Sequence, residues 1–117
     1  MIKLKRAYRP PADDDGFRVL VERLWPRGLS KPEVAIDLWL KEVAPSPQLR
    51  KWFGHDPNKW EKFCRRYWGE LAGKGQEVKI LQSKAQEGDL TLVYGSRDET
   101  HNAAAALKLY LEGHSAG

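Results

Sequence analysis

The apolar run Val19–Val21 most constrains the fold, because consecutive apolar residues are typical of a strand covered on both faces. A second run, Leu90–Tyr94, predicts another buried strand late in the chain. Segments of helical periodicity lie between the two runs. The clearest of these segments places apolar residues at i, i+3, i+4, i+7 and i+11: Trp60, Phe63, Cys64, Tyr67 and Leu71. Strands that alternate with helices indicate a largely parallel sheet.

Weaker patterns complete the expected element order. Alternation over Ile2–Tyr8 predicts a half-exposed strand whose lysines discourage edge pairing, and alternation over Ile36–Lys41 predicts a third strand. Ser46 followed by a proline predicts the start of a helix. The further expected helices are 47–53, one following Asp56-Pro57, 76–87, and a last one that begins near Asp98 and closes at Gly113, with 114–117 fraying.

These elements predict an α/β fold: a single three-layer domain over residues 1–117, with a mostly parallel sheet of about four strands flanked by helices. Ligands of such sheets collect at the carboxyl ends of the strands. Two loops are expected at that edge, 23–28 after the second strand and 94–98 after the fourth. The sequence therefore predicts that these two loops meet at one rim.

Composition narrows the classes of protein. The net charge of +4 favours acidic partners only weakly, and no apolar run approaches the roughly 18 residues of a membrane span. Cys64 is the sole cysteine, so no internal disulfide is expected, and its place in an apolar stripe predicts a buried residue. The run Asp13–Asp15 lacks the ligand spacing of a calcium loop. We expect a cytoplasmic protein with no membrane contact, no metal and no cofactor.

The segment that follows the first buried strand carries the main candidate ligand-binding residues. If the strand continues, Arg23, Trp25 and Arg27 share one side of its end, and Gly28 permits a sharp exit. Guanidinium groups bind carboxylates or phosphates through paired hydrogen bonds, and an indole can stack on a flat ring. The alternative is that the two arginines pair with local acids and hold the loop.

The second loop carries further candidates. Tyr94 and Arg97 would face the first loop as ligand-binding residues. Asp98 could orient His101 as a general base, or it could simply cap the last helix. His55, in a tight turn between two helices, could act as an acid or base, or could fix the turn by hydrogen bonding. Asn102 is expected to anchor a loop.

Three motifs in order resemble the YeaO-like family of small bacterial proteins of unknown function. They are 23–28 (RLWPRG), 52–57 (WFGHDP), and 92–95 (LVYG) followed by Asp98-Glu99 and His101-Asn102-Ala103. The match runs from about residue 2 to residue 111. The resemblance implies a compact α/β domain and brings no established activity.

We carry three hypotheses forward. The first is a pocket for a small anionic, nucleotide-like ligand, with binding and turnover both open. The second is a nucleic-acid-associated or regulatory module that uses Lys62, Arg65, Arg66 and the basic amino-terminal strand on phosphates. The third is an interaction domain without a ligand, whose tryptophans fill the core and a dimer face.

Overall fold

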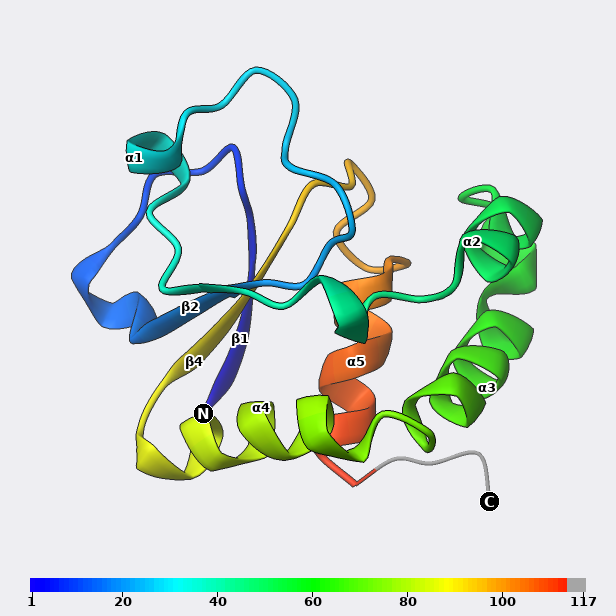
Figure 1. Cartoon of the computed structure of the whole chain (residues 1–117). Helices are drawn as coiled ribbons and strands as arrows, with labels where there is room; N and C mark the ends of the chain where they lie inside the picture. Colours follow the sequence, from blue (N-terminus) through cyan, green and yellow to red (C-terminus); the bar gives the residue numbers. More distant parts are fainter. Residues whose placement is uncertain (114–117) are drawn as a thin grey trace.

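A computed structural model describes residues 1–113 of the chain (Figure 1). The strands are β1 (Ile2–Arg6), β2 (Phe17–Leu20), β3 (Leu38–Trp39) and β4 (Leu90–Tyr94), and the helices are α1 (Lys31–Val34), α2 (Pro47–Phe53), α3 (Trp60–Leu71), α4 (Gly75–Glu87) and α5 (Ala103–Leu111). Short 3-10 turns span Asp13–Asp15, Lys41–Val43 and Pro57–Lys59. None of the helices in this part of the chain combines the length and apolarity needed to cross a bilayer. The expectation for 114–117 lies outside the described residues.

The four strands form one all-parallel sheet in the order β1-β4-β2-β3. Leu92 of β4 lies opposite Leu4 on one side and Val19 on the other, so β4 is fully flanked. Every residue of β4 is buried, whereas β1 is only partly buried at the edge. The α/β class, the parallel sheet and the edge position of the amino-terminal strand are therefore confirmed.

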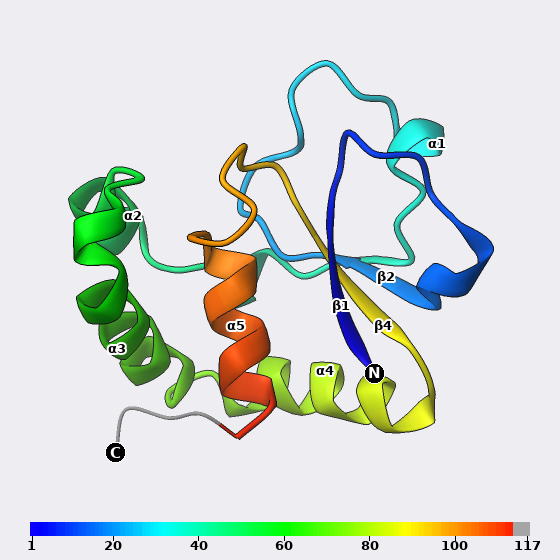
Figure 2. The same cartoon turned by 180° about the vertical axis from the view of Figure 1, so that it is seen from behind.

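The two faces of the sheet carry unequal covers. Leu90, Leu92 and Tyr94 belong to the larger core with α2–α5, while Val93 points into a smaller cluster beneath α1 and the loop 21–37. Figures 1 and 2 show α1 on the flank of the molecule far from α2 and α3. Cys64 is buried in the larger core as predicted, and burial, with a smaller effect of Glu61, raises the pKa of its thiol to about 11.

The helix boundaries follow their capping residues. The Ser46 hydroxyl accepts from the Leu49 N–H at 3.2 Å, and Gly54 ends α2 in the left-handed conformation, as predicted. The start of α5 is a correction. Its N-cap is Asn102, whose side-chain oxygen accepts from the Ala105 N–H at 2.8 Å, and Asp98 instead closes the preceding turn.

The third strand is much shorter than the predicted 36–41, and at its amino end a side chain takes the place of a backbone acceptor. Asp37 accepts the Arg18 N–H through its carboxylate at 2.8 Å, where a longer strand would offer a backbone carbonyl. Only Leu38 and Trp39 pair with β2, and a 3-10 turn begins at Lys41. Alternation in the sequence does not report this competition between side chain and backbone.

A buried ion pair ties the loop before β2 to β1. The Asp15 carboxylate, 5% exposed, receives Arg18 Nη1 at 2.6 Å and Lys5 Nζ at 2.7 Å. Arg18 also donates to the carbonyls of Ala35 and Val34. Burial opposes ionisation of Asp15, but the hydrogen bonds from Lys5, the Ala12 N–H and Arg18 outweigh it and hold its pKa below the usual value.

Candidate functional site

The exit loops of β2 and β4 meet at the carboxyl edge of the sheet. The Gly95 N–H donates to Oε1 of Glu22 at 3.1 Å, and Nε of Arg6, the last residue of β1, donates to the Ser96 carbonyl at 2.8 Å. Three parallel strands therefore contribute to one rim. The predicted meeting of the two loops is confirmed.

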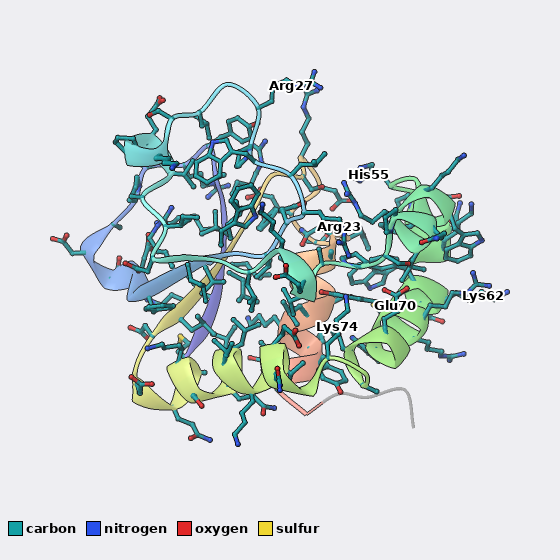
Figure 3. The ribbon with its side chains drawn as sticks, in the orientation of Figure 1. Arg23, Arg27, His55, Lys62, Glu70 and Lys74 are labelled. Atoms are coloured by element: carbon teal, nitrogen blue, oxygen red, sulfur yellow. The ribbon has the colours of Figure 1, made fainter. Side chains whose placement is uncertain are left out.

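A hollow of about 580 Å³ opens beside this junction, between the two loops and the start of α2. Its volume lies in the range of small-molecule sites. Two of its lining residues, Arg27 and His55, are labelled in Figure 3, where they lie apart from each other, Arg27 on the loop 23–28 and His55 beside α2. The hollow is lined by Tyr8, Glu22, Leu24, Trp25, Pro26, Arg27, Pro45, Pro47, Arg50, Lys51, Phe53, His55, Phe63, Gly95, Ser96, Asn102 and Ala103.

Positive charge dominates the lining of the hollow. Arg27, Arg50 and Lys51 contribute three permanent cations, and Glu22 contributes the one carboxylate. The Glu22 carboxylate already receives the Gly95 N–H, which offsets part of its charge. Among residues 1–113 no ion pair involves any of the three cations. The charged side chains of the lining therefore carry an excess of positive charge.

Two of the aromatic side chains that line the hollow, Trp25 and Tyr8, are held by hydrogen bonds to the loop 23–29. Trp25 donates its indole N–H to the Leu29 carbonyl at 2.6 Å and meets Trp39 edge-on at 5.3 Å between ring centroids. The Tyr8 hydroxyl donates to the Arg27 carbonyl at 2.9 Å. These bonds hold the loop on which Arg27 stands, and they leave its guanidinium exposed to solvent.

His55 lines the hollow from a strained turn. It has a φ of 58°, directly after Gly54 at 55°, and a non-glycine residue rarely adopts this left-handed conformation. The turn is held by Asp56, whose carboxylate accepts from the Asn58 N–H at 3.0 Å. The His55 side chain itself is exposed, and its role as an acid or base stays a prediction.

Arg23 lies apart from the hollow. β2 ends at Leu20, so strand alternation does not set the direction of the loop's side chains, and Trp25 packs against the smaller cluster while it also lines the hollow. In Figure 3, Arg23 lies nearer to Lys74 than Arg27 does, and Arg27 lies toward the other end of the loop 23–28. Burial lowers the pKa of Lys74, and the charge of Arg23 lowers it further. The Arg23 Nε is buried without a hydrogen-bond partner among the described residues.

Asp98 and His101 do form a pair, with 3.2 Å between Oδ2 and Nδ1. The backbone N–H groups of His101 and Thr100 bind the Asp98 carboxylate and hold its pKa at about 2. Neither side chain is part of the hollow's lining, and the His101 ring meets Trp60 edge-on at 5.3 Å. Asn102, between them and the hollow, anchors the loop as expected by donating to the Asp98 carbonyl.

The remaining predicted residues also stand outside the lining. Tyr94 is buried in the larger core, and Gly28 occupies an exposed turn with a φ of 82°. Arg97 is exposed. Of the sequence-based candidates, the hollow therefore brings together Trp25, Arg27 and His55.

Sequence reasoning missed the cations of α2. Arg50 and Lys51 fall between the apolar stripe positions Leu49, Trp52 and Phe53, so the signal was present as the polar complement of that stripe. Their convergence with Arg27 depends on how α2 packs. Within residues 1–113, no three His, Cys, Asp or Glu side chains come together to hold a metal ion.

The comparisons with known proteins agree on the family. A family model described as "Inactive DUF488-N3 subclade" matches residues 1–116. The chain belongs to the DUF488-N3i family. The YeaO-like resemblance is confirmed by the Uncharacterized protein YeaO of Escherichia coli (strain K12), which is 43% identical over 110 residues, covering 94% of this chain and 96% of that protein.

A second relative is less similar to this chain. The Uncharacterized protein Rv3073c of Mycobacterium tuberculosis (strain ATCC 25618 / H37Rv) is 35% identical over 112 residues, which cover 96% of this chain and 94% of that protein. The family is therefore represented in different bacteria by chains of similar length. No solved structure matches the chain significantly.

Proposed function

We propose that the chain binds a small anion that carries a flat ring, such as a nucleoside monophosphate, in the hollow at the carboxyl edge of the sheet. The observation that carries the proposal is the combination of Arg27, Arg50 and Lys51 with Trp25 around one hollow of about 580 Å³. The guanidinium groups would bind the phosphate, and the indole would stack on the ring.

We further propose that the ligand is bound and not turned over. The family model that matches this chain is described as inactive. The acid–base pair of Asp98 and His101 lies outside the hollow's lining, and the Glu22 carboxylate is engaged by the Gly95 N–H. His55 is then a residue that shapes the turn and faces the anion.

Calorimetric titration of the full chain tests this proposal with adenosine monophosphate, adenosine and inorganic phosphate as separate probes. The monophosphate should bind more tightly than either fragment. Arg27→Ala should weaken it roughly tenfold or more, because a charge-assisted hydrogen bond contributes about 1.5–3 kcal/mol. Lys79→Ala, on the exposed face of α4, removes the same charge and should change nothing.

Two results would contradict the proposal. Equal losses in Arg27→Ala and Lys79→Ala would mean that only the net charge attracts the anion. Conversion of the monophosphate to another compound during incubation, detected by chromatography, would contradict binding without turnover.

A further inference from the structure

The positive charge of the chain is concentrated in one segment. Residues 50–66 contain six cations and two carboxylates, so this segment alone has the net charge of +4 that the whole chain has. In the rest of the chain, cations and carboxylates are equal in number. The α2–α3 basic surface, as we name it, consists of Arg50, Lys51, Lys59, Lys62, Arg65 and Arg66.

These cations are available to a partner. All of them except the half-buried Lys59 are exposed, and among residues 1–113 none of the six forms an ion pair. The amino-terminal strand differs, because Lys5 pairs with Asp15 at 2.7 Å and Lys3 with Asp89 at 3.6 Å. Of the two basic segments that the sequence suggested for phosphate contacts, the α3 segment therefore offers unpaired charge.

The α2–α3 basic surface shares Arg50 and Lys51 with the lining of the hollow. Lys62 and Arg65 lie on the solvent face of α3, opposite its buried residues, and Figure 3 shows Lys62 on the outer side of that helix. Arg66 stacks over the Trp52 ring of α2 at 4.3 Å, which joins the two helices. Lys51, the neighbour of Trp52, lines the hollow. Cations of α2 therefore belong both to the basic surface and to the hollow.

We propose that the α2–α3 basic surface binds the phosphate backbone of a single-stranded nucleic acid, whose terminal nucleotide occupies the hollow. The proposal has two halves. The terminal-nucleotide half, in which the last nucleotide occupies the hollow, rests on the proposed function. The backbone half, in which the basic surface binds the phosphates, rests on the charge distribution alone. A base must be unpaired to enter the hollow, which selects a single strand over a blunt duplex. Single-strand binders combine a positive track with aromatic side chains in this way.

The composition of the surface disfavours a membrane as the partner. A helix that lies on a bilayer inserts large apolar side chains between its cations. The large apolar side chains that are exposed in the described residues are Met1, Tyr8, Leu24 and Ile80, and none of them belongs to α2 or α3. A polyanion, which is bound through charge without the insertion of apolar side chains, fits this surface better than a bilayer does.

The test measures fluorescence anisotropy of a labelled oligonucleotide of about ten nucleotides, titrated with the full chain across a salt series. Lys62→Ala/Arg65→Ala should weaken binding several-fold. It should also reduce the slope of log affinity against log salt by about 1.4, or about 0.7 for each lost phosphate contact. Lys31→Ala/Lys79→Ala removes the same charge from exposed positions elsewhere and should leave both quantities unchanged.

Displacement of adenosine monophosphate separates the two halves of the proposal. The single strand should displace it from the hollow, a blunt duplex should not, and Lys62→Ala/Arg65→Ala should bind the monophosphate normally. If that variant and its control bind the oligonucleotide equally, the backbone half is overturned. If Lys31→Ala/Lys79→Ala binds the oligonucleotide normally but no monophosphate is bound or displaced, the terminal-nucleotide half fails together with the proposed function. Binding to phosphatidylglycerol vesicles that exceeds binding to the oligonucleotide overturns the whole proposal.

Discussion

The Gly95 N–H donates to Oε1 of Glu22 at 3.1 Å and joins two loops that are 73 positions apart in the sequence. This bond makes the hollow a single site, because it fixes the exit of β2 against the exit of β4. It also places the one carboxylate of the hollow beside a donor that moderates its charge. Glu22 therefore joins the two loops, and its charge would oppose the proposed anion.

Replacement of Glu22 separates these two effects. Glu22→Gln keeps an oxygen that can accept the Gly95 N–H and removes the negative charge, so it should tighten adenosine monophosphate binding by about 1 kcal/mol, or about fivefold. Glu22→Ala removes the acceptor as well and should lower the free energy of unfolding. Calorimetry and urea unfolding measure the two quantities, and weaker binding by Glu22→Gln would contradict an anion site.

Replacement of Arg23 and of Arg27 in the loop 23–28 should have different effects on anion binding. Arg27→Ala removes an exposed side chain and should change the free energy of unfolding by less than about 0.5 kcal/mol while weakening anion binding. Arg23→Met replaces a group whose buried Nε has no partner, so stability should be unchanged or higher and anion binding unaffected. It should also raise the pKa of Lys74, which NMR titration can follow. Loss of anion binding in Arg23→Met would show that Arg23 contributes to the proposed anion site.

The buried pair of Asp15 and Arg18 is the strongest single test of the fold. Asp15→Ala leaves the guanidinium of Arg18, 5% exposed, without its carboxylate, and should cost about 3–5 kcal/mol. Asp14→Ala changes an exposed aspartate next to it and serves as the control in urea unfolding. A loss below about 1 kcal/mol would mean that water replaces the missing carboxylate.

The Asp98 turn should add an acid-dependent component of stability. The hydrogen bonds to its carboxylate lower its pKa from 3.8 to about 2, so the folded state binds the proton less tightly than the unfolded chain. Its contribution is complete above pH 3.8 and disappears as the pH falls through about 2. Asp98→Asn should therefore be less stable at neutral pH and converge on the unmodified chain in acid.

Urea unfolding at several pH values measures this component. Asp14→Asn, an exposed aspartate in another loop, is the matched control. If the free energies of unfolding of Asp98→Asn and the unmodified chain vary with pH in parallel, the turn forms without the charge of Asp98.

Local patterns predicted most of the elements. Leu90–Tyr94 forms β4 with the predicted bounds, and Ser46 and Gly54 delimit α2 as expected. These signals are short-range, because apolar runs, proline positions and capping residues act within a few residues of themselves. The errors lie where one local signal competes with another: the Asp37 carboxylate accepts a backbone N–H at the amino end of β3, and Asn102, not Asp98, caps α5.

The sequence by itself determined the parallel α/β class, the edge at which loops 23–28 and 94–98 meet, and Trp25, Arg27 and His55 as candidates. Tertiary structure alone decided that Arg23 lies outside the lining of the hollow and that Arg50 and Lys51 belong to it. The physical reason is that β2 ends at Leu20. Beyond that residue no strand period sets the direction of a side chain, and the packing of α2 against the rim places the cations.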